Sequence, residues 1–237
     1  MFDFTDQVVM ITGAAGNLGH ATALAFRRGG ARLALANRSY NRLEETFANL
    51  STAGDVLFLA GDLTDPGAVE GLARETIEAF GRIDVLVNVA GGFKMGTPVH
   101  ETPLETWAAM LDLNARTVIY TGRAVIPYML QQHSGKIINV AARAALAGKA
   151  NMGAYIAAKS VVVRLTETMA AELASQGINV NCVLPGTIDT PQNRRAMPQA
   201  NFSNWVAPEA LADVICFLAS PAARAIHGAS VPVYGLS

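Results

Sequence analysis

Tyr155 and Lys159 lie four residues apart in the segment "AYIAAKS" and are the clearest candidates for chemistry in this chain. Four residues are about one turn of an α-helix, so the two side chains would share one helix face. A phenol can give a proton to a substrate, and a neighbouring ammonium favours the phenolate. The spacing therefore predicts an acid whose pKa is lowered by an adjacent cation. A surface tyrosine and lysine on an amphipathic helix would give the same spacing.

A glycine-rich turn near the start of the chain predicts a nucleotide site. The turn "TGAAGNLG" follows the apolar run "VVMI" and precedes a segment with helical spacing. Gly13, Gly16 and Gly19 allow a tight turn and a close approach of backbone to phosphate, and Asn17 and Leu18 belong to the same turn. The helix start then offers free N–H groups to a pyrophosphate. A tight connection without a ligand would use similar glycines, but the position in a β-α-β unit favours a dinucleotide.

The end of the second strand indicates which dinucleotide is bound. Folds of this kind that bind NAD place a carboxylate there, which binds the ribose hydroxyls. This strand ends with Asn37, Arg38 and Ser39, so a guanidinium and two neutral donors can face a 2′-phosphate. NADP is therefore predicted ahead of NAD, although a solvated loop residue is the alternative for Arg38. Asp62 and Leu63, after the third strand, are expected beside the adenine ring.

These residues must be positioned by seven short apolar runs that are predicted to be strands and by helix-length segments between them. The strands are expected at residues 7–12, 31–37, 55–60, 84–90, 135–141, 178–185 and 229–234, and the longer helices at 18–28, 66–80, 103–131, 153–175 and 208–219. Continuous apolar strands imply burial on both faces. The 237 residues are therefore expected to form one α/β domain, a Rossmann-type doubly wound parallel sheet of about seven strands with helices on both faces.

Composition limits the kinds of partner. The net charge of −1 gives no electrostatic reason to expect nucleic acid or an anionic membrane. No apolar stretch reaches the roughly 18 residues of a membrane helix and no secretory signal is visible, so a cytoplasmic protein is expected. Cys182 and Cys216 are expected to be buried thiols. The four histidines show no metal-ligand spacing, so no metal site is expected.

Five motifs, in order and at matching intervals, resemble the short-chain dehydrogenase/reductases over essentially the whole chain: "TGAAGNLG", "NVAG", "LDLNAR", "YIAAK" and "PGTIDT". The resemblance implies an NAD(P)-dependent oxidoreductase of small molecules, with Tyr155 as proton donor and Lys159 on the nicotinamide ribose. It implies that Asn114 lies at a helix kink and holds a water that relays protons to Lys159. It also implies cofactor contacts for Asn88, Ala90, Gly91, Pro185, Gly186, Ile188 and Thr190, the last on the nicotinamide carboxamide. The helices at 103–131 and 153–175 would form the contact of a dimer or tetramer.

Two positions depart from the family's commonest pattern. Asn17 stands where a glycine is usual, and Ala142 stands where a serine is usual, thirteen residues before the tyrosine. Quinonoid dihydropteridine reductases resemble this chain at both places and in "DTPQNRRAMPQANFSNW" (189–205), although those of animals favour NADH through an acid that this chain lacks. Ketone reduction develops alkoxide charge that a second donor stabilises, whereas a conjugated imine spreads the charge over a ring. Ala142 therefore favours a conjugated, electron-poor acceptor.

The segment 189–207 is expected to cover the substrate. Asn193 and Trp205 would offer a polar clamp and a stacking surface, with Phe93 and Ala142 on the other walls, although a packing role for Trp205 is an equal alternative. The first hypothesis is an NADPH-dependent reductase of a conjugated imine or quinonoid carbonyl, such as a dihydropteridine. The second is an ordinary carbonyl reductase or alcohol dehydrogenase. The third, a non-catalytic NADP-binding sensor, is disfavoured because the tyrosine, lysine and asparagine are all retained.

Overall fold

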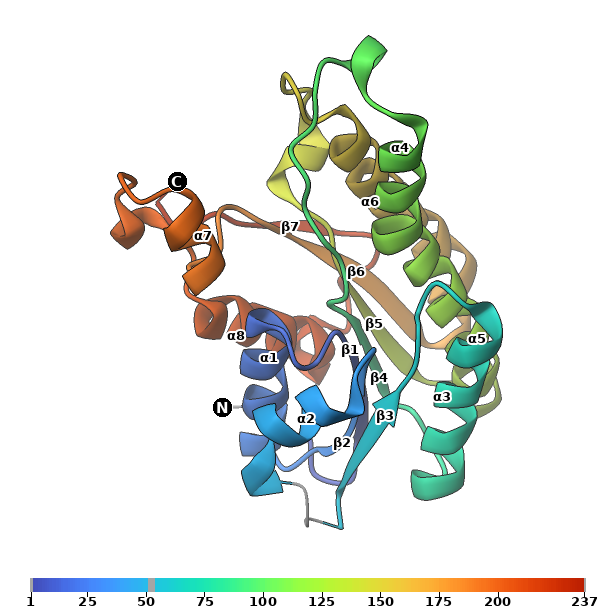
Figure 1. The fold of residues 1–237 in the computed structure, drawn as a ribbon. Helices are drawn as coiled ribbons and strands as arrows, with labels where there is room; N and C mark the ends of the chain where they lie inside the picture. Colours follow the sequence, from blue (N-terminus) through green and yellow to red (C-terminus); the bar gives the residue numbers. More distant parts are fainter. Residues whose placement is uncertain (1, 51–53, 237) are drawn as a thin grey trace.

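One parallel sheet of seven strands organises the protein in the computed structural model, which describes residues 2–50 and 54–236 (Figure 1). The strands are β1 Val8–Thr12, β2 Arg32–Asn37, β3 Val56–Ala60, β4 Val85–Asn88, β5 Gly135–Val140, β6 Ile178–Pro185 and β7 Ser230–Val233. The helices are α1 Asn17–Arg28, α2 Tyr40–Thr46, α3 Pro66–Phe80, α4 Leu104–Leu111, α5 Thr117–Gln132, α6 Gly153–Leu173, α7 Pro191–Ala196 and α8 Pro208–Ala219. The strand order β3-β2-β1-β4-β5-β6-β7, with every neighbouring pair parallel, confirms the predicted doubly wound fold.

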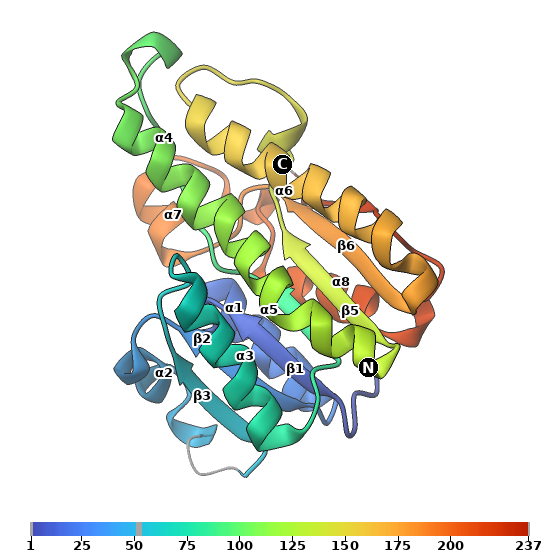
Figure 2. The same ribbon diagram turned by 90° about the vertical axis from the view of Figure 1, so that its right-hand side faces the viewer.

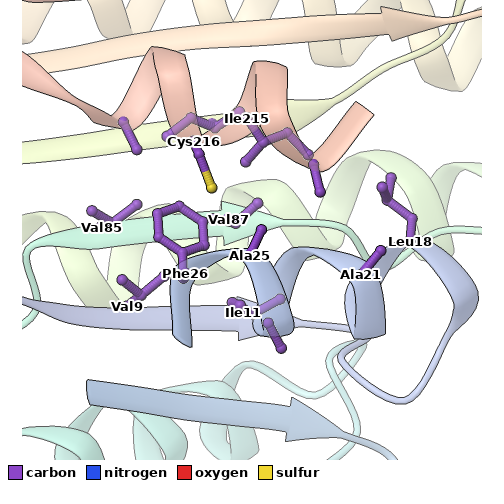
Figure 3. Close-up of a cluster of buried hydrophobic side chains, with 14 of the residues drawn as sticks. Val9, Ile11, Leu18, Ala21, Ala25, Phe26, Val85, Val87, Ile215 and Cys216 are labelled. Carbon is purple, nitrogen blue, oxygen red and sulfur yellow. The ribbon is translucent and has the colours of Figure 1, made fainter. Parts of the chain in front are cut away.

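Side chains of each central strand alternate between two helical layers. Val9 and Ile11 of β1 pack with Phe26 of α1 and Ile215 of α8, in the cluster drawn in Figure 3. Met10, which lies between them in the sequence, belongs to a second cluster formed with α3, α5 and α6. Figure 2 looks onto this second layer, where those helices lie across the strands. Burial on both faces explains why the strands carry continuous apolar runs.

The sheet reverses its winding between β1 and β4. From this pair, β2 and β3 follow on one side, and β5, β6 and β7 follow on the other. Sheets of this type bind ligands in the crevice at the carboxyl ends of the strands, where the order reverses. The turn after β1 and the turn after β4 both open at this place, so the fold itself indicates where the site lies.

The structure changes one predicted helix and adds two. The single helix expected at 103–131 is instead α4, a π-helical segment Asp112–Arg116 and α5. The added helices, α2 and α7, have only seven and six residues, too few for a clear apolar period. They are defined by their caps, because Ser39 accepts a hydrogen bond from the Arg42 N–H and Thr190 accepts one from the Asn193 N–H. Thus α7 lies inside the segment that the sequence predicts to be a loop.

No helix within the described residues 2–50 and 54–236 is long and apolar enough to cross a membrane. Within the same ranges, no group of three or more His, Cys, Asp or Glu side chains is arranged to hold a metal ion.

Candidate active site

Glycine is needed at different positions of the first turn for different structural reasons. Gly13 has φ +63°, and a Cβ there would come within 2.9 Å of the Cα of Ala90. A Cβ on Gly19 would come within 2.3 Å of the Gly13 carbonyl oxygen, so both positions require glycine for packing. Gly16 precedes α1 and faces more open space, and no side chain caps the start of this helix. The first N–H groups of α1 are therefore available to a phosphate.

A cleft of about 640 Å³ opens at the carboxyl ends of β1 to β4. The predicted cofactor residues that line it are Gly13, Gly16, Asn17, Leu18, Gly19, Asn37, Arg38, Ser39, Asp62, Leu63, Ala90, Gly91, Ile188 and Thr190. Lining residues that the sequence analysis missed are Ala15, Arg42, Gly61, Thr64, Val89, Leu113, Thr117 and Gln192. The shape and lining suit an extended dinucleotide, with the glycine-rich turn in the middle and an arginine pair at one end.

Charged side chains gather at the end of the cleft beside β2. Arg38 is exposed, and its Nε lies 3.7 Å from the Asp62 carboxylate. Thr64 donates to that carboxylate from both its N–H (2.9 Å) and its hydroxyl (2.7 Å), and these bonds lower the pKa of Asp62. Arg42 lines the same end from α2, four residues after Arg38, and this spacing was the signal that could have revealed it. Two guanidinium groups against one carboxylate leave a net positive end, which suits a phosphate.

Tyr155 and Lys159 both lie on α6, as the spacing predicts. Lys159 is buried, and its Nζ donates a 2.8 Å hydrogen bond to the carbonyl oxygen of Val140 at the end of β5. Burial lowers the pKa of Lys159 to about 8 and raises the pKa of Tyr155 to about 12. The expectation that the pKa of Tyr155 is lowered is therefore wrong for this structure, because burial of the phenol raises it. A tyrosine with a raised pKa stays protonated and can act as an acid.

Phe93 lies against the tyrosine, and Ala142 lies at the end of β5. The rings of Phe93 and Tyr155 meet edge to face, with centroids 5.0 Å apart and planes at 90°. Phe93 itself is 58% exposed, which is unusual for a phenylalanine and leaves much of its ring open to another molecule. Ala142 is buried and carries no hydroxyl, and it follows Val140, which holds Lys159, by two residues. Ala142 thus supplies no side-chain donor at this place.

Asn114 explains the π-helical segment between α4 and α5. Its amide nitrogen donates to the carbonyl oxygens of Met110 (3.1 Å) and Gly92 (3.0 Å), and its oxygen accepts from the Gly92 N–H (3.1 Å). The side chain thus takes the Met110 carbonyl, which the backbone N–H of Asn114 would bond in a regular α-helix. A Cβ on Gly91 would come within 2.8 Å of the Asn114 oxygen and 3.2 Å of the Lys159 Nζ. Asn114 and Lys159 therefore approach the same backbone position, and the π-helical segment is the interruption of the helix that was predicted at Asn114.

Asn88 lies inside the protein rather than in the cleft. Its amide donates to Asn139 (2.9 Å), and its oxygen accepts from the Thr121 hydroxyl (2.9 Å). The expected contact of this side chain with the cofactor is therefore not seen. The side chain instead links β4, β5 and α5. The neighbouring turn is held by Thr12, whose hydroxyl oxygen accepts from the Val89 and Ala90 N–H groups. A buried asparagine cannot be distinguished from a ligand-facing one by residue type.

The segment 189–207 is largely bonded to itself. Asn193 donates from its side chain to the Ile188 carbonyl oxygen (2.8 Å), so the expected polar clamp is instead a bond that shapes the loop. Trp205 is half-buried and packs on Phe202, with ring centroids 4.8 Å apart, which fits the packing alternative. Pro185 ends β6, and the Gly186 N–H bonds the β7 residue Val233. Asn193, Trp205, Pro185 and Gly186 do not line the cleft, and Tyr155 and Lys159, which were also predicted to bind the cofactor, are not among its lining residues either.

A family model described as short chain dehydrogenase matches residues 7–201. The chain belongs to the short-chain dehydrogenase/reductase family. This membership confirms the prediction of an NAD(P)-dependent oxidoreductase, with the fold that the family resemblance implies.

Individual relatives of this short-chain dehydrogenase/reductase cover nearly its whole length. A 3-oxoacyl-(acyl-carrier-protein) reductase of Synechocystis sp. is 37% identical, over 99% of this chain and 98% of the relative. A solved NAD+-bound xylitol dehydrogenase has a TM-score of 0.90 at 28% identity and covers 98% of this chain and 99% of its own. ElxO with NADP bound has a TM-score of 0.89 at 26% identity, over 97% of both chains. None of the three is a dihydropteridine reductase, so they do not show that finer likeness.

Proposed function

We propose that this enzyme is an NADPH-dependent reductase of a conjugated carbonyl, imine or quinonoid compound. The observation that carries the proposal is Ala142, which supplies no hydroxyl at the end of β5, where relatives of the family usually have serine. With one donor, alkoxide charge on an isolated ketone is poorly stabilised, whereas a conjugated acceptor spreads the charge over several atoms. The exposed face of Phe93 beside Tyr155 supports a planar substrate. A quinonoid dihydropterin is one member of this class.

The positive charge at one end of the cleft and the free backbone N–H groups at the start of α1 support NADPH as the cofactor. Arg38 and Arg42 would bind the 2′-phosphate, with Asn37 and Ser39 as neutral donors. The start of α1 at Gly16 would receive the pyrophosphate, and Thr190 the nicotinamide carboxamide. When bound, the dinucleotide supplies hydride from nicotinamide C4. The Asp62 carboxylate, 3.7 Å from the Arg38 Nε, competes with a phosphate for that guanidinium, whereas Arg42 adds a second positive charge to the lining of the cleft.

Proton transfer is assigned to Tyr155. Its raised pKa of about 12 keeps the phenol protonated at neutral pH, as an acid in the reductive direction requires. Lys159, fixed by the Val140 carbonyl, would bind the nicotinamide ribose and stabilise the phenolate that remains. Asn114 has one lone pair of its oxygen free of the Gly92 bond and could hold the water that returns a proton.

An ordinary carbonyl reductase or alcohol dehydrogenase is the second candidate. The observation that favours it is the Synechocystis relative, whose name describes the reduction of a 3-oxoacyl group. In that case a water or a substrate group would replace the missing serine hydroxyl. The cytoplasmic location and a homodimer or homotetramer are predictions that accompany either candidate.

One substrate panel distinguishes the two candidates. Purified enzyme is assayed with NADPH and with NADH against quinonoid dihydropterin, a quinone, an α,β-unsaturated ketone and a saturated 3-oxoester. The proposal expects turnover with NADPH of at least one conjugated acceptor, and loss of that turnover in Tyr155→Phe. Turnover of the saturated ketoester alone would establish the second candidate and overturn the first.

A further inference from the structure

A single hydrogen bond joins the glycine-rich turn to the helix that covers it. The side-chain nitrogen of Asn17 donates to the side-chain oxygen of Gln192 at 2.9 Å, across 175 positions of sequence. Asn17 is the first residue of α1, and Gln192 is the second residue of α7. Neither residue is required for packing, because both side chains are exposed. A glycine at position 17, which is usual in the family, could not make this bond.

The bond lies where two hollows share part of their lining. Both residues line the cofactor cleft, and Asn17 also lines a second, adjoining hollow of about 550 Å³. The residues common to both hollows are Ala15, Gly16, Asn17 and Thr190. The second hollow continues along Pro191, Arg194 and the start of α8. The bond thus joins α7 to the turn at the residues that border both hollows.

The segment that carries Gln192 is held together as a unit. Thr190 caps α7 by accepting from the Asn193 N–H (3.1 Å), and the Asn193 side chain donates to Ile188 (2.8 Å). Arg194 makes two hydrogen bonds of 2.6 Å to the Asp189 carboxylate. Because these bonds are internal to residues 188–194, they do not fix the unit to the glycine-rich turn. The bond from Asn17 does.

We propose that the Asn17–Gln192 hydrogen bond is a clasp that holds α7 over the pyrophosphate and slows release of the dinucleotide. The proposal rests on the dinucleotide site proposed above and adds a residue pair that controls exchange at it. For a bound dinucleotide to leave, α7 must move away from the turn after β1, and the clasp must break first. An intramolecular hydrogen bond of this kind changes an equilibrium or a rate by about three- to tenfold.

The test is a double-mutant cycle on the release rate. The variants Asn17→Ala, Gln192→Ala and the double variant are loaded with NADPH or NADH, whichever the wild type binds more tightly. Release is followed by stopped-flow nicotinamide fluorescence after mixing with excess oxidised dinucleotide. Each single variant should release about three to ten times faster than wild type, and the double variant no faster than either single one.

A matched control separates the clasp from a general loosening of the segment. Ser203→Ala removes another exposed hydrogen bond of the same covering segment, the 2.7 Å bond from the Ser203 hydroxyl to Asn201, and should leave the release rate within twofold of wild type. Release that is unchanged in both single variants, or that multiplies in the double variant, overturns the clasp alone. Failure of the wild type to bind either dinucleotide overturns the proposed function and the clasp with it.

Discussion

The Lys159 Nζ donates a 2.8 Å hydrogen bond to the carbonyl oxygen of Val140 and is buried at the carboxyl end of the sheet. This bond fixes the ammonium that we propose binds the nicotinamide ribose. The bond does not fully compensate for the lost hydration of the ammonium, because burial still lowers the pKa of Lys159 to about 8. The same burial raises the pKa of Tyr155 to about 12. Of these two groups, the lysine is therefore the one whose charge changes near physiological pH.

The pH dependence of reduction should follow this lysine. The ammonium is present below its pKa and is lost above it, so kcat/KM for NADPH should be constant from pH 6 to 7.5. It should fall about tenfold per pH unit above about pH 8.5. Steady-state rates with a conjugated acceptor between pH 6 and 10 measure this profile. In Lys159→Arg, whose guanidinium stays charged, the remaining activity should show no fall in that range. A wild-type profile that is flat to pH 10 would contradict the assignment.

The buried ammonium should also lower stability. The pKa of Lys159 is about 8 in the folded protein and 10.5 as its ordinary value, so the unfolded chain binds the proton more tightly. The stability contribution is therefore unfavourable below pH 8, by about 3 kcal/mol, and is relieved as the pH rises from 8 to 10.5. Lys159→Met should raise the free energy of unfolding at pH 7 by about 1–3 kcal/mol, since the bond to Val140 is also lost.

Urea unfolding at pH 7 and at pH 10.5 tests whether the buried Lys159 ammonium lowers the stability of the protein. The gain of Lys159→Met should be largest at pH 7 and nearly absent at pH 10.5. Lys149→Met, at an exposed lysine, serves as the control and should change stability by less than about 0.5 kcal/mol at either pH. A destabilised Lys159→Met protein at pH 7 would mean that the hydrogen bond to Val140 outweighs the desolvation of the charge.

The fold and the dinucleotide turn could be predicted because their sequence signals are local and redundant. Each strand is a continuous apolar run, since both faces are buried, and Gly13 and Gly19 are required by contacts that a Cβ would violate. The π-helical segment at Asn114 was visible only as a poor helix residue, because its cause is the capture of the Met110 carbonyl by the side chain. The direction of the Tyr155 pKa shift was wrong because spacing reveals a nearby charge but not the burial that opposes it.

Other site residues depend on long-range packing that sequence spacing does not contain. The amides of Asn88 and Asn193 could each face a ligand or the protein, and the structure pairs them with Asn139 and with the Ile188 carbonyl. Gln192 was missed for the same reason. It enters the cleft only because α7, a helix too short to give a period, folds back over the start of α1.

The preference for NADPH should depend on Arg38. Arg38→Ala should raise KM for NADPH by about 10- to 100-fold, because a charge-assisted hydrogen bond to phosphate is lost, and should change KM for NADH less than threefold. Steady-state kinetics with each dinucleotide measure the two effects. Arg74→Ala is the matched control, since Arg74 is also exposed and also lies 3.7 Å from a carboxylate, that of Glu78, but on α3 outside the cleft. An equal rise in KM for both dinucleotides would show that Arg38 does not recognise the 2′-phosphate.

Restoring the missing hydroxyl should broaden the substrate range. Ala142→Ser places a second donor at the end of β5, where alkoxide charge would develop on a ketone oxygen. Activity on a saturated ketone should rise by about 10- to 100-fold, a part of the 10²–10³ that such a donor contributes elsewhere. Activity on the conjugated acceptor should change by less than threefold, because its charge is already spread over a ring. The ratio of kcat/KM for the two substrates is the measurement.

The size of the new side chain needs its own control. Ala142→Cys introduces a group of nearly the same volume whose S–H is a weak donor, so it should leave the substrate ratio close to that of the unsubstituted enzyme. Ala142 is buried, and a polar group there that finds no partner would lower stability, so thermal melts accompany both variants. If the serine variant folds and ketone activity stays unchanged, another group already supplies the second donor. The ordinary carbonyl reductase would then be the better description of the site.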